Sequence, residues 1–310
     1  MFKGQYGSLE SHQSMIQDEY RTQSYIEAIR RAVKEDDVVI DFGSGSGLLA
    51  MVAAQTAKKV YAIERNKEAA AMILTNLERN EIFNVEICVC DAREFMERYP
   101  NIKADLVISE CIGDHLFENS MVIDFLDLVE HSGAQRQIPS NFRLLHGNKY
   151  IRRKQTQFDK QKAYLSSIGI DLDLMTEDIW SNPFLDVAYF QNSCDDLDPY
   201  FAYEHMTTTK IMEFSTKAEL EPIVELTLED ESSPGDYLML CFRVILYDDI
   251  SFDNFPWRRE SQHHSYYQRL VNVGDLRTNS FLLGINYYHD EIGSESGPNK
   301  NIFVKKNEKK

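Results

Sequence analysis

Residues 36–47 read DDVVIDFGSGSG, an apolar run that leads directly into three alternating glycines. The run is rich in valine and isoleucine, which favours a buried strand. The glycines favour a loop whose backbone N–H groups approach a ligand closely, and the residues that follow (LLAMVAAQTA, 48–57) predict a helix. A strand, a glycine loop and a helix in this order are typical of domains that bind a dinucleotide or S-adenosylmethionine.

On both sides of this unit the sequence alternates between helical and extended patterns. Apolar residues at helical spacing predict a helix over residues 13–34, and further helices are predicted between the strands. Short apolar runs predict three more strands, KVYAIER (59–65), NVEICVCDA (84–92) and ADLVISE (104–110). Elements that alternate at this spacing indicate an α/β fold with a Rossmann-like, doubly wound parallel sheet.

The pattern changes after Pro139. Apolar runs rich in β-forming residues are separated by turn signals such as SSPGD and GSESGPN. We therefore expect a mostly antiparallel β domain, a barrel or a sandwich. The expected division is N-terminal helices over 1–34, a Rossmann-like domain over 35–140 and a β-barrel-like domain over 141–310.

Composition narrows the class of protein. The 310 residues carry a formal net charge of −17, which repels nucleic-acid phosphates and acidic lipid surfaces and attracts cations. No apolar run reaches the roughly 18 residues that a membrane span needs, and the first residues lack the apolar core of a signal peptide. The chain has five cysteines and no CxxC motif, and we expect Cys88 and Cys90 to be buried core residues. A cytoplasmic protein without a nucleic-acid or membrane partner is expected.

The glycine loop distinguishes between two ligand classes. The dinucleotide fingerprint needs Gly-x-Gly-x-x-Gly, whereas the glycines here are Gly43, Gly45 and Gly47, and Leu48 follows. Asp41, two residues before the first glycine, would repel a pyrophosphate. S-adenosylmethionine has no phosphate and carries a cationic amino group, so this cofactor fits the loop.

Two further strand ends carry acids. Glu64 ends the second strand, where its two oxygens can accept from both ribose hydroxyls. Asp91 ends the third strand, where its carboxylate and the Ala92 N–H can meet the edge of an adenine. Carboxyl ends of parallel strands lie on one edge of the sheet, which is the edge that binds ligands. We expect Asp41, Glu64 and Asp91 to bind the cofactor together.

Two stretches resemble one enzyme family. Residues 6–29, YGSLESHQSMIQDEYRTQSYIEAI, resemble the N-terminal helices of protein arginine N-methyltransferases, and residues 109–121, SECIGDHLFENSM, resemble the acidic hairpin of that family. The resemblance implies that the N-terminal helices cover the cofactor, with Tyr6, His12 and Met15 against it. It also implies that Arg21 pairs with the methionine carboxylate, a bidentate match that lysine cannot copy. A homodimer formed through an arm near residues 155–195 follows from the same resemblance.

The hairpin predicts the methyl acceptor. Glu110 would hold a guanidinium and draw its positive charge toward one nitrogen, which leaves another nitrogen richer in electrons for attack on the methyl group. The family has a second glutamate in this hairpin, but an alignment without gaps places Asn119 there, next to Glu118. The Thr-His-Trp loop of the family is also altered, to HHSYYQ, in which His264 matches the histidine. We take Glu110, Glu118, Asn119 and His264 as the candidate catalytic residues, although His264 equally suits a core or surface position.

Three functions remain open from the sequence. The first is methyl transfer to a protein or peptide arginine, and the second is transfer to a small guanidine or amine metabolite. The third is a cofactor-binding regulatory protein without catalysis, because the cofactor residues are intact beside an altered hairpin. The Asn/Asp-Pro-Pro-aromatic motif of exocyclic-amine nucleic-acid methyltransferases is absent after the fourth strand, and the histidines and cysteines show no metal-ligand spacing.

Overall fold

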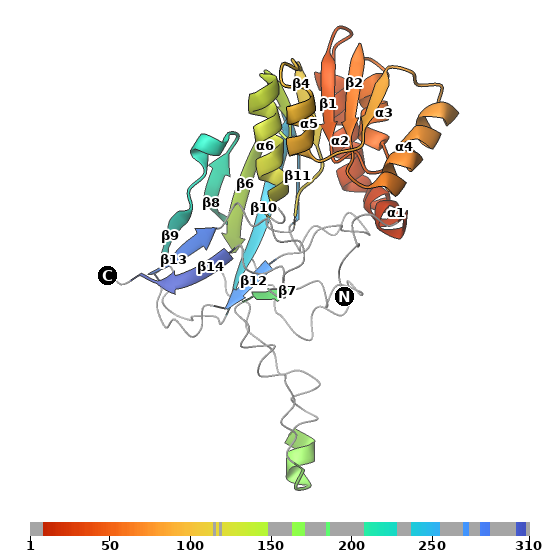
Figure 1. Ribbon diagram of the computed structural model, residues 1–310. Coiled ribbons are helices and arrows are strands. Elements are labelled where there is room, and N and C mark those ends of the chain that lie inside the picture. The colour runs from red at the N-terminus through yellow and green to blue at the C-terminus, as the bar shows by residue number, and fades with distance from the viewer. Residues whose placement is uncertain are drawn as a thin grey trace.

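The computed structural model of the protein describes residues 9–113, 116–117, 120–147, 163–170, 184–186, 208–227, 237–254, 269–272, 280–285 and 302–307. The helix-covered sheet lies at one end of the molecule, and long antiparallel strands extend from it toward the C-terminus (Figure 1). The expected order of an α/β fold followed by antiparallel β structure is confirmed.

Five strands form a parallel sheet in the order β3-β2-β1-β4-β5. Their bounds are β1 Val38–Phe42, β2 Lys59–Ile63, β3 Val85–Cys88, β4 Leu106–Ser109 and β5 Arg136–Ile138. The helices between them are α3 Leu48–Ala54, α4 Lys67–Arg79, α5 Ala92–Arg98 and α6 Met121–Ser132. The strand order reverses between β1 and β4, and ligands bind doubly wound sheets at such a point.

The N-terminal segment forms two helices where the sequence predicts one. They are α1 Leu9–Gln17 and α2 Glu19–Ala32, separated at Asp18. The Asp18 carboxylate accepts a hydrogen bond from the Arg21 N–H at 3.2 Å, so its short side chain caps α2. Apolar periodicity alone does not reveal this break, because a cap changes the chain direction without interrupting the apolar face.

The antiparallel strands form two sheets. One has the path β7-β12-β10-β6-β8 with β11 paired to β10, and the other has the order β14-β13-β9. The bounds are β6 Asn141–Gly147, β7 Phe184–Asp186, β8 Thr208–Phe214, β9 Ile223–Thr227, β10 Tyr237–Tyr247, β11 Ile250–Asp253, β12 Arg269–Asn272, β13 Ser280–Ile285 and β14 Ile302–Lys306. Of the expected arm near residues 155–195, only 163–170 and 184–186 are described. The helical segment at 163–170, light green in Figure 1, lies apart from both halves of the molecule.

A stack of aromatic rings joins the hairpin to the antiparallel strands. The ring of Phe214 on β8 lies between Phe117 of the hairpin, at 5.5 Å, and Phe142 on β6, at 5.1 Å between centroids. All three rings are buried. Cys88 and Cys90 are also buried, as expected, although β3 ends at Cys88 and Cys90 lies beyond it. The hairpin is therefore part of a core that spans both halves of the chain.

Candidate cofactor and acceptor site

Three of the acids that the sequence singles out, Asp41, Glu64 and Glu110, lie at the carboxyl end of the parallel sheet. Asp41 lies in β1, Glu64 follows β2 and Glu110 follows β4, and both β2 and β4 pair with β1. Burial is the main cause that raises the pKa of the Asp41 carboxyl, and the charges of Glu64 and Glu110 act in the same direction. The cluster forms because β1 is the central strand, so acids on its neighbours converge on it.

The glycine loop passes close beneath two other segments. Gly43 has a φ of 72°, and a Cβ added to it would lie 1.9 Å from the Cys111 Sγ. Gly45 has a φ of 54°, and a Cβ there would lie 3.2 Å from the His12 Nε2. Only glycine combines these left-handed conformations with such close approach. The loop is therefore enclosed by the start of the hairpin on one side and by α1 on the other.

Asp41 has an incompletely satisfied carboxylate. The residue is 1% exposed, and its Oδ2 has no hydrogen-bond partner among the described residues. Burial raises the pKa of this carboxyl to about 7, and the charges of Glu64 and Glu110 act in the same direction, whereas the Ser44 hydroxyl donates to the Asp41 backbone carbonyl at 3.0 Å. A buried oxygen without a donor is costly, so the site is suited to a ligand that brings a cationic or hydroxyl donor to it.

Glu64 is held in place by the backbone. Its Oε2 accepts from the Gly45 N–H at 2.9 Å and its Oε1 from the Asn66 N–H at 2.7 Å. A carboxylate oxygen can accept more than one hydrogen bond, so both oxygens keep capacity for a ligand. The arrangement suits the predicted role toward ribose hydroxyls, which stays a prediction.

Asp91 has a clear structural role. It caps α5, and its Oδ1 accepts from the Glu94 N–H at 2.8 Å. Ala92 begins the helix and is buried. Contact of these two residues with an adenine stays a prediction.

The N-terminal helices contribute His12, Met15 and Arg21. His12 is buried over the glycine loop, and its Nδ1 has no partner among the described residues. The Met15 carbonyl oxygen accepts a hydrogen bond from the Arg21 Nη2. The structure thus places α1 over the loop, as a cofactor cover requires. Tyr6 lies outside the described residues.

Glu110 forms an ion pair with an arginine of the chain itself. The Arg21 Nη1 lies 2.9 Å from the Glu110 Oε1, and the two side chains are 6% and 21% exposed. A guanidinium therefore already occupies the carboxylate that the sequence assigns to the acceptor. The sequence predicts both residues for the site but not this pairing, because 89 positions separate them.

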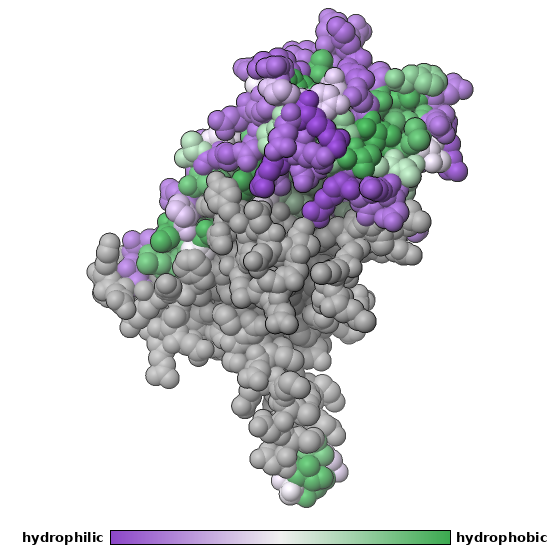
Figure 2. Space-filling view, in the orientation of Figure 1, coloured by the Kyte–Doolittle hydropathy of each residue, from purple (hydrophilic) through white to green (hydrophobic). Residues whose placement is uncertain are grey.

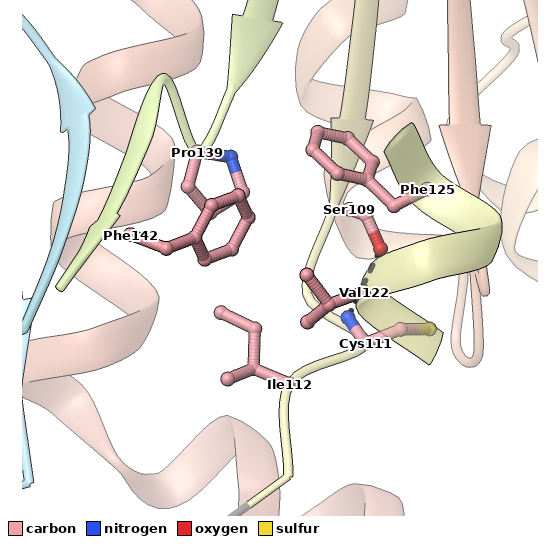
Figure 3. Close-up of a pocket in the computed structure, with 7 residues that line it drawn as sticks. All are labelled: Ser109, Cys111, Ile112, Val122, Phe125, Pro139 and Phe142. Atoms are coloured by element: carbon pink, nitrogen blue, oxygen red, sulfur yellow. Dashed lines mark hydrogen bonds between the residues drawn. The ribbon is translucent and has the colours of Figure 1, made fainter. Parts of the chain in front are cut away.

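The backbone at the start of the hairpin is fixed by three hydrogen bonds. The Ser109 Oγ donates to the Phe42 carbonyl at 2.9 Å and accepts from the Cys111 N–H at 3.0 Å, and the Tyr25 hydroxyl donates to the Ser109 carbonyl at 2.9 Å. Residues at the start of the hairpin also line a small pocket against Phe142 (Figure 3). Figure 3 shows the hydrogen bond between Ser109 and Cys111, with Ile112 pointing toward Phe142 and the Cys111 sulfur pointing away from the pocket. Sequence reasoning assigned no role to Ser109 or Cys111; their position beside Glu110 is the signal that would have found them.

Three of the candidate catalytic residues lie outside the described residues. Glu118, Asn119 and His264 are not described, so their roles stay predictions. The neighbours of Glu118 and Asn119 are described: Phe117 is buried in the aromatic stack, and Ser120 precedes α6 with a φ of 57°. Within the described parts of the chain, no cluster of three metal-binding side chains occurs and no helix is long and apolar enough to cross a membrane.

Comparison with known proteins finds that the parallel-sheet half is similar in sequence to methyltransferases. A family model described as ribosomal protein L11 methyltransferase matches residues 20–135. An uncharacterized protein of Methanocaldococcus jannaschii is 37% identical over 127 residues, which are 41% of this chain and 48% of that protein. Protein arginine N-methyltransferase 1 of Caenorhabditis elegans is 36% identical over 115 residues, which are 36% of this chain and 33% of that protein. The chain thus spans about half of one relative and a third of the other.

The likeness of fold extends further than the likeness of sequence. A solved structure of the Trypanosoma brucei protein arginine methyltransferase 1 enzyme–prozyme complex with S-adenosylhomocysteine superimposes with a TM-score of 0.66 at 18% identity. The match covers 90% of this chain and 88% of that chain, so it includes the antiparallel half. Over its parallel-sheet half the chain is similar in sequence to methyltransferases, and its fold is the one seen in this protein arginine methyltransferase structure.

Proposed function

We propose that this protein transfers a methyl group from S-adenosylmethionine to a guanidinium nitrogen. The observation that carries the proposal is the Arg21–Glu110 pair, in which a partly buried carboxylate at the end of β4 already binds a guanidinium. A carboxylate matches a guanidinium because its two oxygens can accept hydrogen bonds from two parallel N–H groups of the planar guanidinium. The same carboxylate lies in a cluster with Asp41 and Glu64, so the surroundings favour a positively charged acceptor.

The cofactor assignment rests on the glycine loop and the groups around it. Asp41 offers an unpartnered buried oxygen to an ammonium group, Glu64 offers two acceptors to hydroxyls, and the loop leaves no space for side chains. When bound, S-adenosylmethionine supplies a methyl group carried on a positively charged sulfur. A relative of known structure was determined with S-adenosylhomocysteine, the product of such a transfer, which supports the same cofactor here.

The residues of the chain would bind, orient and polarise the acceptor. The acceptor nitrogen forms the new C–N bond with its lone pair while the C–S bond breaks, and the electrons of that bond remain on the sulfur. The proton that the nitrogen loses passes to water or to a nearby base, for which His264 is a candidate. Glu110 holds the positive charge of the acceptor, and proximity supplies much of the rate.

Arg21 would bind the methionine carboxylate of the cofactor once its ion pair with Glu110 is broken. A methionine carboxylate within its reach would compete with Glu110 for the guanidinium, and the acceptor would then take its place on Glu110. Glu118 and Asn119 remain the candidates for a second contact to the acceptor. We further propose that the chain consists of N-terminal helices over 1–34, a cofactor-binding domain over 35–140 and a β-barrel-like domain over 141–310. We also propose that two copies form a homodimer through the segment near 155–195. In support of the dimer, Tyr164, Ile168 and Ile170 are exposed apolar side chains.

The test is transfer of a labelled methyl group. The protein is incubated with methyl-labelled S-adenosylmethionine and a glycine-serine peptide that contains one arginine, and mass spectrometry locates the label. A peptide with lysine in place of arginine is the matched acceptor control. Glu110→Gln should remove transfer, whereas Glu94→Gln, which removes an exposed carboxylate that pairs with Arg98, should not. Transfer to the lysine peptide alone would refute the guanidinium assignment.

A small guanidine or amine metabolite is the second candidate acceptor. The replacement of the second family glutamate by Asn119 favours it, because a weaker clamp suits an acceptor other than peptide arginine. Methyl label that appears in small molecules of a cell extract, and not in the arginine peptide, would select it. Binding of S-adenosylhomocysteine without transfer to either acceptor would favour the non-catalytic alternative.

A further inference from the structure

Helix α2 holds Glu110 at two points. Arg21 binds its carboxylate, and one helical turn later Tyr25 donates from its hydroxyl to the Ser109 carbonyl at 2.9 Å. That carbonyl belongs to the peptide bond between Ser109 and Glu110. Because residues four apart lie on the same face of a helix, one face of α2 controls both the backbone and the side chain of this position.

The Tyr25 hydroxyl is a stable donor at this point. The ring is 1% exposed, and burial together with the negative charge of Glu110 holds the pKa of the hydroxyl well above its ordinary value. The group therefore stays protonated and cannot act as a base under ordinary conditions. What it can do is fix the direction of the Ser109 carbonyl, and with it the peptide plane from which Glu110 projects.

The same peptide is held from the opposite side by β1. The Ser109 Oγ donates to the Phe42 carbonyl and accepts from the Cys111 N–H, and the Cys111 Sγ fills the space above Gly43. Residues 109–111 are thus clamped between the end of β1 and α2. The helix in turn is joined to the antiparallel half, since the Tyr20 hydroxyl donates to the Ser251 carbonyl at 3.0 Å.

We propose that Tyr25 is a positioning residue for methyl transfer, which acts by fixing the peptide that carries Glu110. The inference rests on the proposed role of Glu110 toward the acceptor and assigns no contact between Tyr25 and either ligand. Loss of the hydroxyl leaves the ring in the core but removes one of the three hydrogen bonds that fix the start of the hairpin, so the Ser109–Glu110 peptide is held less firmly. The carboxylate then samples orientations that do not point its oxygens at the acceptor.

The test compares two variants that each lose one hydroxyl of the same helix. Tyr25→Phe removes the bond to Ser109, and Tyr20→Phe removes the bond to Ser251, which lies on the antiparallel side. We expect Tyr25→Phe to lower kcat for the arginine peptide by about 10- to 100-fold, the effect of a misplacement of about 1 Å. The KM for S-adenosylmethionine and the affinity for S-adenosylhomocysteine should stay within about twofold, and Tyr20→Phe should keep the wild-type kcat.

A second readout does not depend on turnover. With ¹⁵N-labelled arginine, the side-chain N–H signal of Arg21, assigned with Arg21→Lys, reports on the ion pair with Glu110. Tyr25→Phe should shift or broaden this signal, and Tyr20→Phe should leave it in place. Wild-type kcat with an unshifted signal in Tyr25→Phe would overturn the proposal, as would an equal loss of kcat in both variants.

The two proposals fail in different ways. If the wild-type protein binds S-adenosylhomocysteine but methylates no arginine peptide, the proposed acceptor is wrong. The NMR comparison of Tyr25→Phe with Tyr20→Phe then still decides whether Tyr25 positions Glu110. If the peptide is methylated and only the signal and kcat of Tyr25→Phe stay unchanged, the proposed function stands and the positioning role is rejected.

Discussion

Binding of the cofactor should release a proton from Asp41. Its ordinary pKa is 3.8, and burial raises it to about 7 in the ligand-free protein. Near neutral pH the carboxyl is therefore partly protonated, and a cationic amino group placed against its Oδ2 would favour the ionised form. The affinity for S-adenosylhomocysteine, which carries the same amino group, should therefore change between pH 6 and pH 8.

The magnitude follows from the pKa. With a value of about 7, the ionised fraction rises from roughly 10% at pH 6 to roughly 90% at pH 8, so affinity should increase about ninefold, or about 1.3 kcal/mol. At pH 7 about half a proton should leave for each ligand bound. A carboxyl usually has a lowered pKa in the folded protein and adds stability as pH rises, whereas the raised pKa of Asp41 has the opposite effect. The folded state holds a proton that the unfolded chain has lost, so the ligand-free protein loses stability as pH rises from about 4 to 7.

Titration calorimetry at pH 7 in phosphate and in Tris measures the proton release, because the two buffers differ in ionisation enthalpy. Asp41→Asn should abolish the difference between the buffers. The ionisable groups that interact with Asp41 are Glu64 after β2, Glu110 and Cys111 after β4, and Tyr25 on α2; Arg21 on α2 lies against Glu110, and His12 on α1 lies over Gly45. His12→Gln is the matched control at the same loop, and it should keep the release because Asp41 is unchanged. Equal enthalpies in both buffers and a flat affinity between pH 6 and 8 would refute the reasoning.

Three further changes test the site and the core. Glu110→Gln should lower the rate of transfer by roughly 30- to 1,000-fold, since a charge-assisted bond to a desolvated cation is lost. Calorimetry should find that S-adenosylhomocysteine still binds, at least as tightly as to the wild type, because the carboxylate that competes for Arg21 is gone. Gly43→Ala should lower the melting temperature because the added Cβ would lie 1.9 Å from the Cys111 Sγ, and a second change, Cys111→Ala, should restore part of the loss. If the second change restores nothing, the loss of stability comes from the left-handed φ of residue 43 alone. Phe214→Ala should cost about 3–5 kcal/mol in urea unfolding because it empties the centre of the aromatic stack, and a cost below about 1 kcal/mol would show that the ring is not part of a shared core.

The local pattern of the sequence determined the parallel half of the fold. From β1 to β4, strand runs of four or five residues, helices of 7 to 13 residues and a glycine loop follow one another in the order expected, whereas the sequence predicted neither α6 nor the three-residue strand β5. Such elements are predictable because hydrophobic spacing and glycine placement act over a few neighbouring residues. For the same reason the sequence located Asp41 and Glu64 at strand ends. It did not locate the end of the first helix at Asp18, where a capping bond redirects the chain.

Only the tertiary structure decided how these residues act on one another. The order β3-β2-β1-β4-β5 places β1 between β2 and β4, so Asp41 is buried, which raises its pKa, and the charges of Glu64 and Glu110 add to this effect. Helix α2 packs so that Arg21 and Tyr25 both reach the start of the hairpin. Cys111 fills the space above Gly43 in the same way, across 68 positions of sequence. These contacts join segments that are distant in the chain. Their energies depend on burial and on the distance between atoms, and neither quantity is encoded in the spacing of residues along one strand or one helix.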